Sequence, residues 1–267
     1  MKTLLYFVFL LIAASPVAAH EYWFAPDSFF LIPHQSTNVH LFVGEALKMD
    51  EERVYQGSKT ASFQMFGPSG TFDLRSMSDE EKSPILKFAS DSAGTFLFSM
   101  ERNWSYITLE AGKFEDYLRD EGMEYIIPQR AKLGESKKEG KERYSRFLKT
   151  LVQVGDSRTG IVKDRVNTKL EIVPLDNPYS KRTGQTLPFQ IWFDRRPLAN
   201  YAVFADNRDG KDIVTQKLTA DKDGVVNLKL TRRGIWLVRL VVMKRCEKHC
   251  EGADWESFWG ALSFGVK

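Results

Sequence analysis

Hydrophobic and polar residues alternate in short runs through the first part of the chain, from about Glu21 to Leu109. The run 37–43 alternates with a period of two, which is the period of a half-buried β-strand. Further β-like runs follow at 61–66, 85–89, 95–100 and 105–109. Turn-forming segments at 67–70 and 92–94 separate them. This pattern predicts an antiparallel β-sandwich domain over residues 20–110.

The same kind of pattern returns near Leu170 and continues to the end of the chain. Asp209-Gly210 and Asp223-Gly224 are typical of hairpin turns. The β-like runs of this part are 170–173, 187–193, 201–205, 213–218, 225–230, 236–242 and 258–264. So many short strands predict an immunoglobulin-like or prealbumin-like β-sandwich over residues 166–267.

Between these two parts, the apolar residues recur at helical spacing. The first group is Phe114, Tyr117 and Leu118, and the second is Tyr144, Phe147, Leu148 and Leu151. The pattern predicts a helical connecting region over 111–165, with an exposed loop at 132–141. The predicted fold class is therefore mainly β: two antiparallel β-sandwich domains with a helical segment between them.

The first nineteen residues have the features of a secretory signal peptide. Lys2 precedes an apolar run from Leu4 to Ala14, and Val17 and Ala19 occupy the small-residue positions of a cleavage site. We expect cleavage after Ala19, which makes His20 the first residue of the mature chain. The mature protein is then expected to be soluble and either periplasmic or secreted.

Composition and charge exclude several classes of function. Hydrophobic residues make up 43% and aromatic residues 13%, and the net charge is only +3. The basic segment 130–149 is interleaved with Glu135, Glu139 and Glu142, which is typical of a solvated face and not of a nucleic-acid surface. Gly-x-Ser-x-Gly and His-Glu-x-x-His are both absent from the sequence, and no pair of carboxylates can be assigned to acid–base chemistry. We therefore expect no nucleic-acid partner and no enzymatic activity.

The four histidines are the candidate metal ligands: His20, His34, His40 and His249. An N-terminal histidine carries an α-amine and an imidazole, which together can chelate a transition metal. His40 lies in phase with Asn38 and Phe42, on the more polar side of its predicted strand, and His34 follows Pro33 in a predicted loop. Imidazole suits nickel, cobalt, copper and zinc. The alternative is that His34 and His40 are ordinary solvated side chains and that His20 merely follows the cleavage site.

Cys246 and Cys250 are the only two cysteines. In an exported protein they are expected to form a disulfide. The alternative is a thiolate metal site that includes His249. The nearby group of Trp255, Phe258 and Trp259 favours core packing, with a carbohydrate-stacking surface as the alternative.

Several of these segments together resemble a known family. They are His20 to Pro26 directly after the signal peptide, Gly155-Asp156-Ser157, Leu170 to Tyr179, and Asp254 to Trp259. The chain resembles domain-of-unknown-function family 4198 over essentially all of its mature length. The family is described as the periplasmic component of cobalt or nickel transport systems.

This resemblance implies a function. It implies that a divalent transition metal is captured outside the inner membrane, with His20 as the first ligand and a membrane metal transporter as a partner. Many members have a histidine just before the methionine that here is Met243, but this chain has Val242 there. Cys246, His249 and Cys250 follow a few residues later and are candidate substitutes.

The leading hypothesis is therefore an exported, periplasmic metal-binding protein that captures nickel or cobalt for uptake. Its expected ligands are His20 and His40, completed by His34 or His249. The first alternative is a copper redox protein built on an N-terminal histidine brace. The second is a non-catalytic envelope binding module, whose contact surface would be formed by Trp255 and Trp259.

Overall fold

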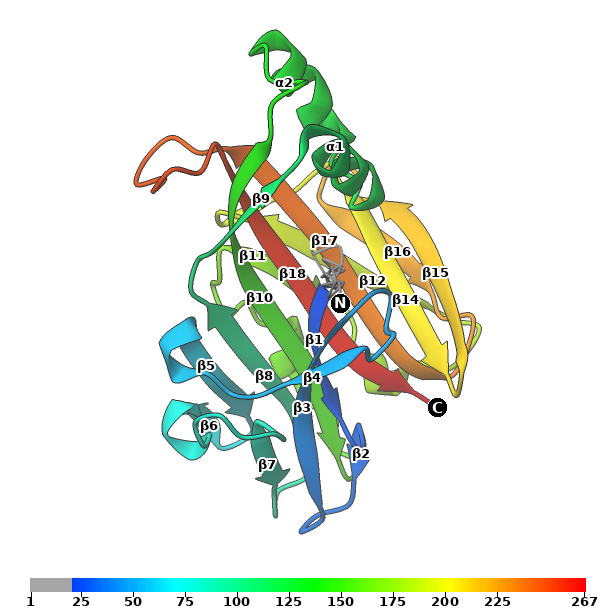
Figure 1. Ribbon diagram of the computed structural model, residues 1–267. Helices are drawn as coiled ribbons and strands as arrows, with labels where there is room; N and C mark the ends of the chain where they lie inside the picture. The colour runs from blue at the N-terminus through cyan, green and yellow to red at the C-terminus, as the bar shows by residue number, and fades with distance from the viewer. Residues whose placement is uncertain (1–20) are drawn as a thin grey trace, which may run out of the picture.

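A computed structural model describes residues 21–267 of the chain, so the predicted signal peptide 1–19 and His20 lie outside the described residues. The fold is mainly β and contains three sheets (Figure 1). The prediction of a β-sandwich-type fold is confirmed.

The N-terminal sheet contains four strands. They are β1 (Glu21–Pro26), β3 (Ser36–Gly44), β4 (Glu51–Arg53) and β7 (Leu86–Ala89). β1 runs antiparallel to β3, with Glu21 opposite Gly44 and Ala25 opposite His40. Burial alternates along β3 as the sequence predicts, and His40 lies on its half-exposed side. β1 is buried along its whole length, because both of its faces are covered.

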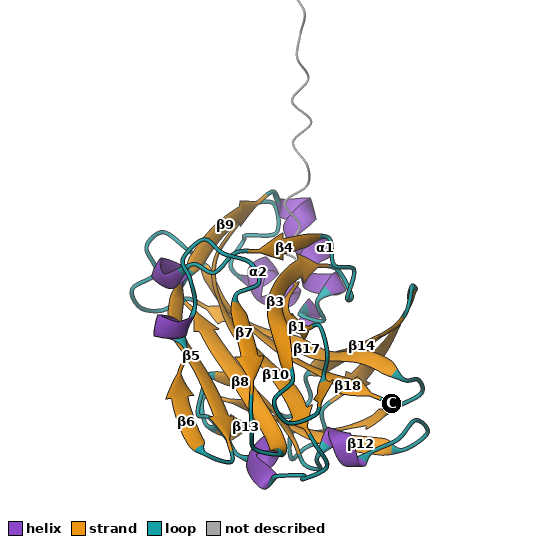
Figure 2. Ribbon diagram, turned by 90° about the horizontal axis from the view of Figure 1, so that it is seen from below, coloured by secondary structure: helices purple, strands orange, loops and turns teal. Residues whose placement is uncertain are grey.

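The largest sheet has ten strands and forms the centre of the molecule (Figure 2). Its main order is β15-β14-β17-β18-β10-β8-β5-β6, and β2 and β9 also pair with β10. The strands are β2 (Phe30–Leu31), β5 (Thr60–Gly67), β6 (Gly70–Asp73), β8 (Gly94–Arg102), β9 (Ser105–Leu109), β10 (Gly140–Val154), β14 (Ala202–Asp209), β15 (Asp212–Thr219), β17 (Gly234–Arg245) and β18 (Trp255–Val266). β10 and β18 are parallel neighbours. Hydrogen bonding in this sheet is therefore continuous across the two predicted domains.

The third sheet contains β11 (Leu170–Pro174), β12 (Thr186–Phe193), β13 (Arg196–Pro197) and β16 (Val225–Lys229). Its Phe189 packs with Trp236 and Phe264 of the central sheet in one core. A second core lies between the N-terminal and central sheets and includes Phe24 and Leu148. The central sheet is therefore the middle layer of a three-layered arrangement.

Two helices, α1 (Ala111–Asp120) and α2 (Ile127–Lys132), lie beyond β9 at one end of the central sheet (Figure 1). Phe114, Tyr117 and Leu118 are the buried residues of α1, as their spacing predicts. The helices share a third core with Trp255 and Trp259. The short 3-10 turns are η1 (Gly57–Lys59), η2 (Arg75–Met77), η3 (Glu124–Ile126), η4 (Gly160–Lys163) and η5 (Pro178–Ser180).

The prediction of helix through the second half of 111–165 is wrong. Tyr144, Phe147, Leu148 and Leu151 lie on β10, a strand of 15 residues. Phe147 and Leu151 face the core beneath the third sheet, and Leu148 faces the core beneath the N-terminal sheet. Because both faces of β10 are buried, its sequence lacks the alternation that would have indicated a strand.

Candidate functional site

Four charged side chains meet at the start of β1, the first described strand. The guanidinium of Arg239 on β17 lies 2.8 Å from the carboxylate of Glu21, 3.0 Å from that of Glu121 and 2.7 Å from that of Asp206. We refer to Glu21, Glu121, Asp206 and Arg239 as the acid cluster. Its members come from β1, the end of α1, β14 and β17.

Local structure fixes each carboxylate. Glu121 directly follows α1, and Gly122 then turns the chain with a φ of +72°. A Cβ atom at Gly122 would lie 2.6 Å from the Cβ atom of Ala202, so glycine permits the close approach of this turn to β14. Asp206 accepts a hydrogen bond of 2.6 Å from the Thr215 hydroxyl. Glu21 accepts one of 3.3 Å from the backbone N–H of Ala46.

The acid cluster buries more negative than positive charge. The exposed fraction of the side chain is 0% for Asp206, 5% for Glu21 and 11% for Glu121. Burial raises the pKa of Glu121 to about 8; Arg239 opposes this rise, and Glu21 and Asp206 add to it. Burial also raises the pKa of Glu21. One guanidinium therefore does not compensate three carboxylates, and the cluster retains protons above the ordinary titration range of glutamate.

Another buried charge group in the molecule is not short of positive charge. Glu171 is fully buried and lies 2.7 Å from Lys149 and 3.3 Å from Arg165. This contrast makes the acid cluster a candidate site, since uncompensated buried charge is costly to fold and is concentrated at functional sites.

The space beside the acid cluster is small. A cavity of about 10 Å³ is lined by Glu21, Tyr22, Glu121, Arg239 and Trp259, among others. That volume is near the lower limit for one water molecule. The site therefore has room for a small ion or a water, and an organic ligand does not fit.

His40 is not adjacent to the acid cluster. Its Nδ1 lies 2.6 Å from Glu52 and its Nε2 lies 2.9 Å from Asp27, so both ring nitrogens already face carboxylate oxygens. Hydrogen bonds from Ser83 and His40 lower the pKa of Glu52, although burial, the largest single influence, opposes this. Gly44, the partner of Glu21, lies four positions beyond His40 on β3, which is about 13 Å along the strand.

His34 and His249 lie at opposite ends of the molecule. His34 lies just after β2, and its Nδ1 is 2.8 Å from Asp91. The same segment bonds to the end of β10, through Gly155 N–H and the Leu31 carbonyl. The loop that carries His249 reaches the start of β10 instead, where Asp254 N–H bonds to the Lys141 carbonyl. The structure thus does not bring His34, His40 and His249 together.

Cys246 and Cys250 form a disulfide, so neither sulfur is present as a free thiolate. Trp255 and Trp259 are 0% and 4% exposed, which excludes them as a carbohydrate-stacking surface and agrees with core packing. Within residues 21–267, no group of three or more His, Cys, Asp or Glu side chains is arranged to hold a metal ion. In that same part of the chain, no helix is long and apolar enough to cross a membrane.

From the sequence, Glu21 is a possible oxygen donor because it follows His20 directly, whereas nothing in the sequence predictions pointed to Glu121, Asp206 or Arg239. A signal for two of them was present in the sequence. Arg239 interrupts the apolar run 236–242, and Asp206 follows the apolar run 201–205. A charge inside a run that must be buried indicates a polar cluster in the core. The partners of each charge, however, come from distant parts of the chain.

Comparison with known proteins places the chain in a family. The model of the family "Domain of unknown function (DUF4198)" matches residues 17–244, and the chain belongs to this family. None of the curated proteins matches the chain. Among solved structures, the chain is similar to the three N-terminal domains of the bacteriophage RB49 Highly Immunogenic Outer Capsid protein (Hoc), at 7% identity and a TM-score of 0.19. That match covers 91% of this chain and 59% of the phage chain.

Proposed function

We propose that the protein is an exported, periplasmic metal-binding protein that captures nickel or cobalt for uptake. The α-amine and imidazole of His20, freed by cleavage after Ala19, are its nitrogen donors. The observation that carries this proposal is the uncompensated acid cluster at Glu21, the residue next to His20 in the sequence. Delivery to a membrane metal transporter belongs to the same proposal.

The charges of the acid cluster support the binding of a cation at the start of β1. A divalent ion there offsets the excess of carboxylates and displaces the proton that Glu121 holds at neutral pH. Amine and imidazole nitrogens favour nickel, cobalt and copper over magnesium and calcium, which prefer oxygen ligands. Because His40 is paired with Asp27 and Glu52, we propose that one or two carboxylates of the acid cluster, and not the other histidines, complete the site with His20.

The test is metal binding by the mature protein, produced with its own leader and checked for its N-terminal residue by mass spectrometry. Isothermal titration with Ni²⁺ and Co²⁺ should show one site per chain, with an affinity that increases from pH 6 to pH 8.5. Inserting one alanine before His20 moves the amine away from the imidazole and the cluster, and should reduce the affinity at least about tenfold.

His34→Ala is the matched control, because His34 is exposed and lies at the far end of β10, and it should bind metal as the parent does. Equal affinity of the insertion variant and the parent would refute the proposal. Tight binding of Cu²⁺ with peroxide production in the presence of a reductant would favour the histidine-brace alternative. The envelope-module alternative is weakened because Trp255 and Trp259, its expected contact residues, are buried.

A further inference from the structure

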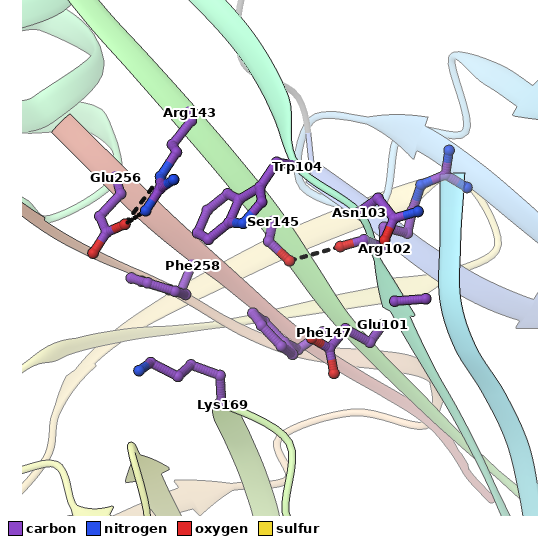
Figure 3. Close-up of a pocket in the computed structure, with 11 residues that line it drawn as sticks. Glu101, Arg102, Asn103, Trp104, Arg143, Ser145, Phe147, Lys169, Glu256 and Phe258 are labelled. Carbon is purple, nitrogen blue, oxygen red and sulfur yellow. Dashed lines mark hydrogen bonds and ion pairs between the residues drawn. The ribbon is translucent and has the colours of Figure 1, made fainter. Parts of the chain in front are cut away.

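A second candidate site lies on the opposite face of the central sheet. A cavity of about 300 Å³ opens where the end of β8, the turn before β9, and strands β10 and β18 meet (Figure 3). We call it the Trp104 cavity. Phe258 of β18 lines it, whereas the next residue, Trp259, lines the small space beside the acid cluster. Because neighbouring residues of a strand point to opposite faces, the two sites are separate.

Three aromatic rings form the body of the Trp104 cavity. Trp104 is half-buried and meets Phe258 edge to face, with 5.5 Å between the ring centroids. Phe147 stacks on Phe258, with 6.3 Å between the centroids. Figure 3 shows the three rings around one space, with Glu101 beside Phe147. The apolar part of a ligand is therefore expected to lie among these rings, close to Glu101.

Two cations of the lining are already engaged by carboxylates. The guanidinium of Arg143 donates to Glu256 and to two backbone carbonyls of the loop that the disulfide closes. The ammonium of Lys169 lies 3.1 Å from Asp194, beside the ring of Phe258. Both cations are thus held in the wall by groups of the protein itself, and neither is paired with Glu101.

The third cation of the lining, Arg102, points away from the cavity. Its guanidinium lies 5.7 Å from the ring centroid of Tyr22, which belongs to the core on the other face of the central sheet. On the cavity side, Arg102 contributes its backbone carbonyl, which accepts a hydrogen bond of 2.7 Å from the Ser145 hydroxyl (Figure 3). The charge of Arg102 is therefore directed to the opposite face.

Glu101 is the carboxylate of the lining that has no such partner. It is half-buried, and among residues 21–267 no side chain donates a hydrogen bond to its carboxylate and no cation forms an ion pair with it. Burial raises the pKa of Glu101, and no cation in the described part of the chain opposes this rise. A negative charge in this position is costly to bury without a counter-charge. The cavity thus combines apolar walls with one uncompensated carboxylate.

We infer that the Trp104 cavity binds an arylalkylamine, a small primary amine with one aromatic ring on a short chain. The ammonium group donates to the Glu101 carboxylate, and the ring lies among Trp104, Phe147 and Phe258. A ligand with a carboxylate in place of the ammonium meets the negative charge of Glu101 and is rejected. The volume is at the lower end of the range for small-molecule sites, which suits one ring and a short chain.

Titration of the mature protein with three compounds of similar size tests the inference: 2-phenylethylamine, 2-phenylethanol, which is neutral, and 3-phenylpropanoate, which is negatively charged. Chelator-treated protein is used, so that bound metal does not contribute. We expect the amine to bind at least about tenfold more tightly than either other compound, because only the amine makes a charged hydrogen bond to Glu101. Trp104 fluorescence should change on binding, and Trp104→Phe should remove that change.

A further comparison, n-propylamine, tests the aromatic part of the ligand. It has the ammonium group and a short chain but lacks the ring, so it loses the apolar contacts with the three aromatic side chains. We expect it to bind at least about tenfold more weakly than 2-phenylethylamine. Equal affinities of the two amines would overturn the assignment of an aromatic ligand to this cavity.

Variants assign the ammonium to Glu101. Glu101→Gln should weaken 2-phenylethylamine binding about tenfold and leave 2-phenylethanol unaffected, because the amide keeps the shape of the side chain and removes its charge. Lys169→Met should not weaken amine binding, since Lys169 takes no part in it. Glu110→Gln, at an exposed carboxylate outside the cavity lining, should bind as the parent does.

Three results would overturn the inference. They are parent affinity for the amine in a folded Glu101→Gln variant, binding of 3-phenylpropanoate by the parent protein as tightly as the amine, and no binding of the amine up to about 10 mM. The last two are measured on the parent protein and so do not depend on the folding of a variant.

Discussion

At the scale of single residues, the buried charges of this protein are arranged in two ways. Arg143 with Glu256 and Lys149 with Glu171 are compensated pairs, of the kind that keeps a charge tolerable inside a protein. The acid cluster instead places three carboxylates around Arg239. The free energy that this arrangement costs is a reason to expect a cation there, and it makes Arg239 the residue on which the cluster depends.

Replacing Arg239 should destabilise the protein strongly. Arg239→Met leaves three buried carboxylates without a counter-charge and should lower the free energy of unfolding by about 3–5 kcal/mol. Urea denaturation followed by circular dichroism measures this change. Arg182→Met, at an exposed position whose guanidinium has no bonded partner among the described residues, should leave the midpoint nearly unchanged. Equal midpoints for the two variants would contradict the compensating role of Arg239.

Glu121 should make stability decrease as pH rises. Its pKa is about 8 in the folded protein and near 4.5 when unfolded, so the folded state binds the extra proton between these values. The contribution is fully present below pH 4.5 and is lost as pH rises through 8. The slope is at most about 1.4 kcal/mol per pH unit. Buried Glu142, with a pKa raised by burial to about 7, acts in the same direction.

Thermal unfolding of metal-free protein between pH 5.5 and 8.5 tests this pH dependence. Glu121→Gln should flatten the curve, because glutamine does not titrate. Glu110→Gln, at an exposed carboxylate just before α1, should keep the parent slope. If the slope of Glu121→Gln matched that of the parent, the folded pKa of Glu121 would have to lie near its ordinary value.

At the scale of elements, β10 joins the layers of the molecule, and it is a strand although its apolar residues recur at helical spacing. Phe147 and Leu148 are both buried because they face different cores. The polar residues of the same strand are buried as well: Arg143, Arg146 and Lys149. The spacing of apolar residues along the sequence cannot distinguish such a strand from a helix, because burial of each face depends on which distant elements cover it. The strand β3 was predictable, because only one of its faces is fully buried and alternation survives.

The contact between β10 and α1 depends on a glycine. A Cβ atom at Gly140 would lie 2.3–2.5 Å from the ring of Phe114, and the guanidinium of Arg130 stacks on the same ring at 4.7 Å. Gly140→Ala should therefore push Phe114 out of place and cost about 1–3 kcal/mol of unfolding free energy. Gly112→Ala, within α1 where nothing lies near the added atom, should be neutral or slightly stabilising. Chemical denaturation of both variants measures the difference, and equal stability would contradict this packing.

At the scale of the whole molecule, the sequence predicts the fold class and the family better than it predicts how the strands are arranged in sheets. Turn residues and the alternation of apolar and polar residues identify many strands. Pairing between strands that are distant in the sequence, however, has no signal in the residues of either strand. The parallel pairing of β10 with β18 joins Glu142 to Trp255 and continues to Thr150 and Ser263. The acid cluster could not be predicted for the same reason, because its four residues come from four distant segments and form no sequence motif. His20 could be proposed as a ligand from the sequence alone, because a cleavage site and chelation by an N-terminal histidine are both predicted from neighbouring residues.

The predicted division of the chain into two separate domains can be tested, because the central sheet contains strands from both of them. A fragment of residues 166–267 keeps β17 and β18 but loses β10, which pairs with β18 at nine positions. It also loses the helices that cover Trp255 and Trp259. An unpaired strand and an exposed aromatic cluster favour aggregation. We expect the fragment to aggregate or to melt without a cooperative transition, and the chain 20–267 to unfold in one transition seen alike by circular dichroism and tryptophan fluorescence. A monomeric fragment that melts cooperatively would instead identify an independent C-terminal sandwich, with the long parallel pairing adding little to its stability.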